Sequence, residues 1–326
     1  MTAGRRRRHV APAERIVPAS RATVDLHTHT RRSDGVLEPA ALVRAAADAG
    51  VRLLALTDHD TLAGYRQVVA AGAPPGIEVV AGVEINCIVA DDGGPWEGEL
   101  HVLGLGVHPT DEAFEAALAR QRDSRRIRFG RMLARLRELG MPVDDEAAGL
   151  TTSDDDALGR PTVARALIAR GHATSVEDAF RRLLGRGKPA HVPRAGLGPI
   201  DAIRAIRAAG GLPVLAHFSE AAERIGTVRE LADAGLAGLE VHYLAFDAPT
   251  VEAVGEVADA LGLVRTGGTD YHGDLSSYAD ALAGLWLPDG VGERVRAALA
   301  ETPAADPVRR YLGGRSSGRP SPSAGR

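Results

Sequence analysis

Two histidines stand one residue apart near the start of the chain, in the stretch VDLHTHT at residues 24–30. Side chains alternate between the two faces of a β-strand, so a strand here would place His27 and His29 on the same face. Two imidazoles that share a face form either a pair of metal ligands or a coincidence. The remaining histidines and carboxylates of the chain distinguish these readings.

Short apolar runs predict seven strands, at 23–29, 53–58, 78–85, 100–106, 213–217, 238–242 and 263–269. Nine of the metal-ligating side chains on or just after these strands are candidate ligands: His27, His29, Asp34, His59, Glu84, His101, His217, Asp270 and His272. In parallel α/β folds the active site forms at the carboxyl ends of the strands, where the loops converge. The pattern therefore predicts an active site built from these nine residues.

Each of these signals is weak by itself. A lone strand histidine such as His101 is more often structural, and the Asp-Gly pair after Ser33 is more often a turn. The TDHD stretch at 57–60 could equally cap a helix. Taken together, mixed imidazole and carboxylate ligands suit Mn, Zn or Fe, and nine ligands with one bridging carboxylate would fill three adjacent sites. The pair His27 and His29 is thus interpreted as a pair of metal ligands.

Amphipathic segments alternate with the predicted strands, which indicates an α/β fold with a mostly parallel sheet closed into a barrel. The predicted organisation is a disordered basic tail at 1–20, barrel at 21–108, a helical insertion at 109–190, barrel again at 191–302 and a disordered tail at 303–326. A run of insertion arginines is expected to form a solvated helix face, with a phosphate-attracting rim as the less favoured alternative: Arg122, Arg125, Arg126, Arg128, Arg131, Arg135 and Arg137.

Bulk composition excludes several classes of protein. The chain has 326 residues, 44% of them hydrophobic and 25% charged, which is typical of a globular protein. A net charge of −4 does not indicate a globally basic nucleic-acid-binding surface. No apolar run reaches bilayer-spanning length, the N-terminus lacks a signal-peptide core, and Cys87 is the only cysteine, so we expect a cytoplasmic protein without membrane contact.

The motifs DLHTHT…SDG, ALTDHDT, GVEI, VLAH and TGGTDYHG occur in that order and resemble those of the PHP superfamily (polymerase and histidinol phosphatase). The resemblance covers about residues 21–287 and is greatest to the branch with nucleoside 3′,5′-bisphosphate phosphatases and RNase AM-type 5′→3′ exoribonucleases. It implies a distorted seven-stranded (β/α) barrel with a helical insertion. It also implies hydrolysis of phosphate esters by a water activated by clustered metal ions.

By this resemblance, the first metal site would use His27, His29, Glu84 and Asp270. The second would use Glu84 as a bridge, with His101 and His217, and the third would use Asp34, His59 and His272. We expect about three divalent ions per chain on this ligand count, most simply Mn, with Zn or Fe as alternatives. Glu84, His217 and Asp270 are the expected catalytic residues.

Other positions carry weaker expectations. Asp25, Asp58 and Asp60 are interpreted as carboxylates that orient the ligand imidazoles, although capping of a loop explains Asp58 and Asp60 equally well. Arg160, in a GRP segment that resembles the family's substrate-binding stretch, is expected to contact a substrate phosphate.

Lys188 could add a positive charge at the substrate site, although a surface position is the commoner outcome for a lysine. The chain departs from the family pattern at Thr162, Phe218 and 242–248. There His242 and Tyr243 either replace family residues in part or are inert.

The leading prediction is a phosphoesterase acting on a nucleotide such as a nucleoside 3′,5′-bisphosphate, with a 5′→3′ exoribonuclease on short 5′-phosphorylated RNA as the alternative. An amidohydrolase-like C–N hydrolase usually needs a bridging lysine, and Lys188 is the only lysine and lies outside any predicted strand. A non-catalytic PHP module typically loses ligands, whereas all nine are present here. No obligate protein partner is evident.

Overall fold

The fold is built on seven strands that follow one another around a nearly closed barrel, in the order β1 to β7. The computed structural model describes residues 22–89, 99–150, 158–302 and 310–312. The strands are β1 (Val24–Asp25), β2 (Leu53–Leu56), β3 (Glu78–Ile88), β4 (Glu99–Leu105), β5 (Leu212–Leu215), β6 (Gly238–Tyr243) and β7 (Val264–Gly268). The backbone N–H of Leu26 donates to the carbonyl of Gly267 at 3.1 Å and links the first strand to the last.

Most neighbouring strands are parallel, but β4 runs antiparallel to both β3 and β5. The strands are short apolar runs buried on both sides, as the fully buried sequence LLAL of β2 illustrates. Burial on both faces is typical of a sheet covered by helices and explains why these strands lack an alternating pattern.

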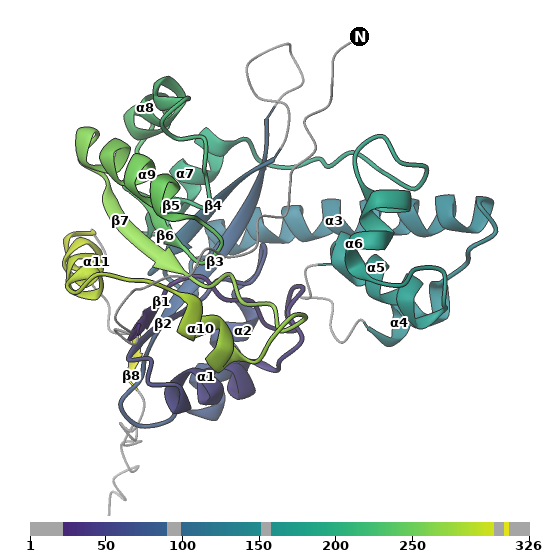
Figure 1. Ribbon diagram of the computed structural model, residues 1–326, viewed down its shortest axis with the longest axis horizontal. Helices are drawn as coiled ribbons and strands as arrows, with labels where there is room; N and C mark the ends of the chain where they lie inside the picture. Colours follow the sequence, from purple (N-terminus) through teal and green to yellow (C-terminus); the bar gives the residue numbers. More distant parts are fainter. Residues whose placement is uncertain (1–21, 90–98, 151–157, 303–309, 313–326) are drawn as a thin grey trace, which may run out of the picture.

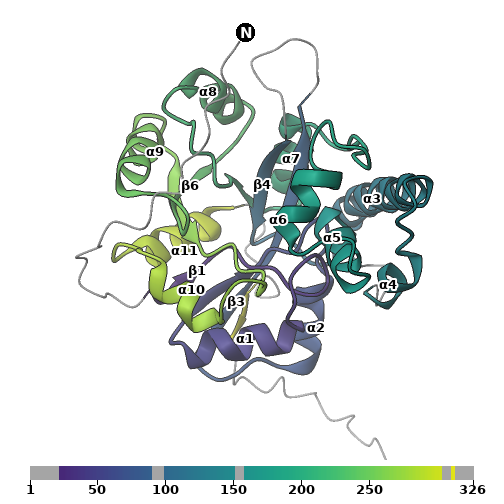
Figure 2. The ribbon, with the colours of Figure 1, turned by 45° about the vertical axis from the view of Figure 1, so that its right-hand side comes forward.

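Seven helices surround the barrel (Figures 1 and 2). They are α1 (Pro39–Asp48), α2 (Ala63–Ala71), α7 (Pro199–Ala208), α8 (Ile225–Asp233), α9 (Ala248–Ala260), α10 (Tyr278–Gly284) and α11 (Val291–Glu301). Proline stands in the first turn of α1, where its missing N–H costs nothing, and Gly50 follows the helix at φ 98°. None of the described helices is long and apolar enough to cross a bilayer.

A group of helices between β4 and β5 lies to one side of the barrel, at the right of Figure 1. These are α3 (Glu112–Glu138), α4 (Asp144–Gly149), α5 (Arg160–Ala169), α6 (Val176–Ala179) and the single turn η1 (Phe180–Leu184). They share a hydrophobic cluster of their own, centred on residues such as Met132, Leu136 and Leu167. The helices from the later part of α3 to η1 therefore pack around a second core, whereas Phe114 and Leu118 of α3 belong to the barrel core.

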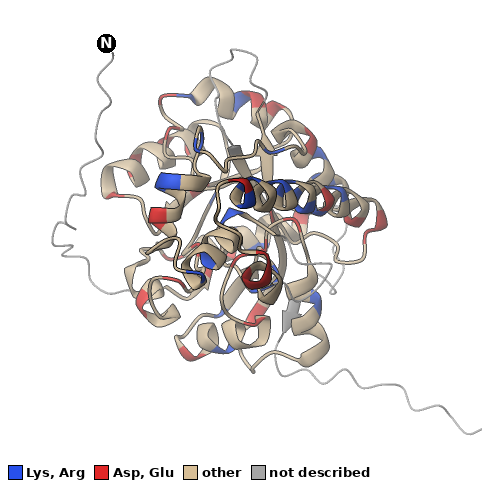
Figure 3. Cartoon of the chain, turned by 90° about the vertical axis from the view of Figure 1, so that its right-hand side faces the viewer, with Lys and Arg blue, Asp and Glu red and all other residues tan. Residues whose placement is uncertain are grey.

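The arginines of α3 are not all solvated, in contrast to the sequence-based expectation. Arg122, Arg125 and Arg128 are each only 4% exposed, whereas Arg131 and Arg137 are exposed. A helical period shows which residues share a face, but it does not show whether another part of the chain covers that face. Figure 3, which views the insertion side, shows both signs of charge interspersed there.

Two segments were predicted to be disordered, at 1–20 and 303–326, and the structure describes residues in only one of them. Residues 1–20 lie outside the described residues. Within the predicted C-terminal tail, β8 (Arg310–Leu312) pairs antiparallel with β3, and the remainder of 303–326 lies outside the described residues.

Candidate metal centre

His27 and His29 lie immediately after β1, which ends at Asp25, four residues before the predicted end of this strand at His29. The strand ends early because the backbone here turns to the loop after β7, where His29 N–H donates to the carbonyl of Tyr271 at 3.0 Å. Both imidazoles still point the same way. Their Nε2 atoms lie 3.5 Å and 3.2 Å from Oε2 of Glu84.

Glu84, on β3, lies at the centre of the cluster and is 1% exposed. Its Oε1 lies 2.6 Å from His101 Nδ1 and 3.2 Å from His217 Nε2. Its Oε2 lies 2.9 Å from His59 Nδ1, in addition to the contacts with the two histidines after β1. One carboxylate therefore contacts five imidazoles, which is the arrangement that a bridging ligand requires.

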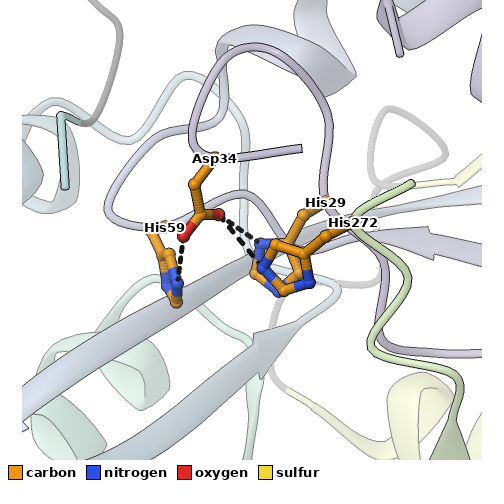
Figure 4. A group of neighbouring side chains, drawn as sticks. All are labelled: His29, Asp34, His59 and His272. Atoms are coloured by element: carbon orange, nitrogen blue, oxygen red, sulfur yellow. Dashed lines mark ion pairs between the residues drawn. The ribbon is translucent and has the colours of Figure 1, made fainter. Parts of the chain in front are cut away.

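Asp34 organises a second part of the cluster (Figure 4). Its Oδ1 lies 3.2 Å from His272 Nε2 and 3.6 Å from His29 Nδ1, and its Oδ2 lies 3.4 Å from His59 Nε2. The rings of His29 and His272 stack with centroids 4.3 Å apart. His29 and His59 thus connect the carboxylate of Asp34 to that of Glu84.

Asp270, from the loop after β7, brings a third carboxylate to the cluster. Its Oδ1 lies 3.3 Å from His27 Nε2 and 3.2 Å from His29 Nε2. Its Oδ2 accepts a hydrogen bond from the hydroxyl of Tyr243 at 3.0 Å. All nine residues singled out in the sequence are therefore brought together at one end of the barrel.

Their ligand atoms form three groups in which the atoms lie within 4.8 Å of one another. The groups are His29, Asp34, His59 and His272; His27, His29 and Glu84; and Glu84, His101 and His217. This grouping parallels the expected sets, but it adds His29 to the third set and leaves Asp270 out of the first.

The residues fit divalent metal ions. The buried Nε2 atoms of His27 and His29, Nδ1 of His59 and Oδ1 of Asp34 lie close to atoms of opposite charge, yet none of them makes a hydrogen bond of acceptable geometry among the described residues. Buried polar atoms are normally paired. Imidazole lone pairs and carboxylate oxygens that converge from several sides are satisfied together when a cation lies between them.

The carboxylates of the cluster favour the protonated, positively charged form of the neighbouring imidazoles. Burial alone lowers the pKa of His59, but the carboxylates of Asp34 and Glu84 outweigh it and raise the pKa to about 10. For His272, burial is similarly outweighed by Asp34 and Asp270, and the pKa rises to about 9. Burial raises the pKa of the Asp34 and Glu84 carboxyls, yet the surrounding imidazoles hold both well below the usual range.

Backbone strain is concentrated at this centre. Among the described residues, the non-glycine positions with positive φ are Asp60 at 52°, His217 at 35° and Asp270 at 51°. Each follows a strand at the edge of the cluster. Left-handed backbone is costly for residues with a Cβ and persists where the surrounding structure holds it, often at functional sites.

The three aspartates expected to orient imidazoles behave differently. Asp58 accepts hydrogen bonds from Thr30 N–H at 2.7 Å and from the Ser33 hydroxyl at 2.8 Å. The same Ser33 oxygen lies 3.4 Å from His29 Nδ1, so Asp58 acts on an imidazole through Ser33.

Asp25 accepts from the backbone N–H of Thr269 at 3.0 Å and from the hydroxyl of Tyr278 at 2.8 Å. It therefore fixes the loop that carries Asp270 rather than a ring. Asp60 pairs with Arg125, whose Nε lies 2.5 Å from its Oδ2. Among the described residues, neither Asp25 nor Asp60 is hydrogen-bonded to an imidazole ring.

Sequence reasoning missed Glu240, which is fully buried on β6. Its carboxylate accepts from His27 Nδ1 at 3.0 Å and from the backbone N–H of His217 at 2.8 Å. It therefore fixes the orientation of two candidate ligands. The signal was present in the sequence, because GLEV around Glu240 repeats the pattern of GVEI around Glu84 on another strand of the barrel.

A cavity of about 200 Å³ opens directly onto the cluster. Arg125, Arg160 and Arg194 line it together with metal-site residues, and the guanidinium of Arg160 lies 5.3 Å from the ring centroid of Phe180. Lys188, in contrast, is exposed and is not part of the lining. The structure thus brings Arg160 to the candidate site and does not bring Lys188 there.

Comparison with known proteins gives the family. The model of the PHP domain matches residues 25–142. A 3′,5′-nucleoside bisphosphate phosphatase of Chromobacterium violaceum is 32% identical over 77% of this chain and 87% of its own. The chain belongs to the PHP family. Another PHP-related sequence, a 5′-3′ exoribonuclease of Haemophilus influenzae, is 37% identical over 59% of this chain and 68% of its own.

A solved structure supports the same conclusion for the fold. It is described as an amidohydrolase from Chromobacterium violaceum with bound sulfate and no metal. It matches with a TM-score of 0.73 and 28% identity, over 85% of this chain and 96% of its own. The predicted PHP fold, a distorted seven-stranded barrel, is confirmed.

Proposed function

We propose that this PHP protein is a metal-dependent phosphoesterase that hydrolyses a phosphate ester of a nucleotide, such as a nucleoside 3′,5′-bisphosphate. The observation that carries the proposal is the position of Glu84, which contacts five imidazoles beneath a cavity lined by three arginines. The names of the relatives support the same reaction class, since they include a nucleoside bisphosphate phosphatase and an exoribonuclease.

Three divalent ions, most simply Mn, are proposed to occupy the three ligand groups. Such ions, when bound, lower the pKa of water and neutralise the charge that develops on phosphoryl oxygens. Within this site we propose Glu84, His217 and Asp270 as the catalytic residues, because all three line the cavity in which the phosphoryl group would lie. Asp34, His59 and His272 also line this cavity.

The arginines are proposed to recognise a second phosphate. Arg125 is held in place by Asp60 and by the side chain of Asn86, and the Asn86 amide also contacts the His101 ring. Arg160 begins α5 and reaches the cavity from the insertion. Guanidinium groups bind phosphate through two parallel hydrogen bonds, so these side chains suit a phosphate that is retained while another is cleaved.

A 5′→3′ exoribonuclease is the second candidate function. The observation that favours it is a larger cavity of about 820 Å³, which adjoins the cluster at Asp270 and His272 and extends to Arg165. This cavity gives space for a nucleotide beyond the one that carries the cleaved ester. The C–N hydrolase alternative has less support, because a bridging lysine is absent from the cluster and Lys188 is exposed elsewhere.

A substrate panel tests the proposal. Adenosine 3′,5′-bisphosphate and a short 5′-phosphorylated oligoribonucleotide are each incubated with the Mn-loaded protein, and phosphate and nucleotide release are quantified. Glu84→Gln is the inactive reference, and Glu256→Gln, on the exposed side of α9, is the matched control. Hydrolysis of neither substrate by a metal-loaded protein would contradict the proposal, and preference for the RNA would favour the second candidate.

A further inference from the structure

A separate cavity of about 430 Å³ lies between the end of β6, helix α9 and the segment after α10. Its principal lining residues are His242, Tyr243, Phe246, Val251, Arg265 and Trp286. The metal-site function uses none of these except Tyr243. A volume of this size lies in the range of small-molecule pockets, which are typically about 300–1,000 Å³.

His242 is the unusual feature of this cavity. It is 2% exposed, and neither of its ring nitrogens has a hydrogen-bond partner among the described residues. Burial lowers the pKa of His242 to about 4, with smaller contributions from Arg265 and Arg294. A neutral imidazole carries one N–H donor and one acceptor nitrogen, so a matching ligand would supply both an acceptor and a donor.

The walls of the cavity select the shape and charge of the ligand. The Trp286 ring lies 5.2 Å from His242 at an interplanar angle of 67°, and Phe246 adds a second aromatic surface. Arg265 brings little free charge, since its Nε donates to Asp259 at 2.9 Å and its Nη2 donates to a backbone carbonyl. Glu252, which is exposed, also lines the cavity and disfavours an anionic ligand, so these aromatic walls suit a flat ring system without negative charge.

Tyr243 connects this cavity to the metal centre. Its ring lies 5.1 Å from that of Phe246 inside the cavity, and its hydroxyl donates to Oδ2 of Asp270 at 3.0 Å. Displacement of the Tyr243 ring would therefore change the hydrogen bonding of a candidate metal ligand.

We propose that this cavity binds an uncharged planar heteroaromatic molecule of the nucleobase or nucleoside class, and that its occupancy regulates the metal centre through Tyr243. The regulatory part rests on the proposed phosphoesterase function, whereas the binding part does not.

Adenosine is the probe for binding, measured by equilibrium dialysis against the full-length protein. Val251→Phe narrows the cavity, and His242→Phe removes the ring nitrogens while keeping an aromatic side chain. Val69→Phe, at an exposed position on α2, is the matched control. We expect saturable binding to the wild type, at least tenfold weakening in both cavity variants, and no change in the control. Retention of binding in Glu84→Gln distinguishes this cavity from product binding at the metal centre.

Absence of saturable binding to the wild type would overturn the proposal. So would binding that is lost in Glu84→Gln but kept in both cavity variants. For regulation, saturating adenosine should change the rate of aryl phosphate hydrolysis by at least twofold in the wild type and leave it unchanged in Val251→Phe and in Tyr243→Phe. Adenosine binding without any change in the rate of aryl phosphate hydrolysis would refute the regulatory part. If the protein has no hydrolytic activity, the dialysis experiment still tests whether the cavity binds adenosine.

Discussion

Replacing Glu240 by glutamine removes one acceptor from the framework that holds two candidate metal ligands. The native carboxylate accepts from His27 Nδ1 at 3.0 Å and from the backbone N–H of His217 at 2.8 Å. A glutamine amide has a single oxygen, so it accepts a hydrogen bond from only one of these two donors and places its NH₂ group against the other donor. The fully buried position allows no water to replace the lost bond.

Loss of a buried charge-assisted hydrogen bond costs about 1.5–3 kcal/mol, which corresponds to about one to two orders of magnitude in affinity. We therefore expect Glu240→Gln to weaken the apparent affinity for Mn²⁺ about 10- to 100-fold, in line with the usual effect of residues that orient ligands. The assay is phosphate release from the bisphosphate substrate as a function of free Mn²⁺ in a metal buffer. Excess Mn²⁺ should restore much of the activity.

The control for this variant is Glu256→Gln, which changes the same chemical group at an exposed position of α9. It should retain the Mn²⁺ dependence of the wild type. If Glu240→Gln also retained that dependence, the role assigned to Glu240 in orienting the two histidines would be refuted.

Three further predictions follow from the cluster and its cavity. Glu84→Ala should abolish measurable turnover, because its carboxylate contacts five imidazoles; wild-type turnover in a steady-state assay would show that Glu84 is not a bridging ligand. Arg160→Ala should lower kcat/KM for a bisphosphate about 10- to 100-fold, as expected for loss of a charge-assisted contact, and leave kcat/KM for an aryl phosphate nearly unchanged. Equal losses of kcat/KM on both substrates would show that Arg160 does not recognise the second phosphate. His59 and His272 have raised pKa values, so protonation of these imidazoles stabilises the folded EDTA-treated protein. This stabilisation is complete below about pH 6.5 and is lost as the pH rises toward 9–10, so the Tm of the protein should fall over that interval. Asp34→Asn should flatten this dependence in a thermal-shift titration, and an unchanged slope would contradict the assigned cause.

Most strand positions could be predicted from the sequence, because most of the strands are buried and largely apolar, but β1 ends four residues before its predicted end at His29. Their directions could not be predicted from the runs themselves, since an apolar segment reads the same in both directions. The antiparallel pairing of β3 with β4 could have been found from the connection at 89–98, which is shorter than the crossover that parallel neighbours need. The pairing of β8 with β3 had no comparable local signal.

The ligands of the centre were predictable because metal-binding side chains stand at strand ends in the sequence. Their supporting residues were harder to predict, since support depends on contacts between distant segments. Arg125 was expected in solvent, yet it is buried against Asp60 at the barrel end. Asp25 stands two residues before His27 and accepts from its backbone N–H, but its other partners, Thr269 and Tyr278, approach only after the barrel closes.

The central claim is that three ligand groups joined by Glu84 hold the metal ions that hydrolyse the phosphate ester. The most direct measurement is a Mn²⁺ titration of the metal-free protein, with bound metal counted by elemental analysis and phosphate release measured on the same samples. We expect about two to three ions per chain and activity that rises with their binding. Trace metal at saturation, or full activity without bound metal, would contradict it.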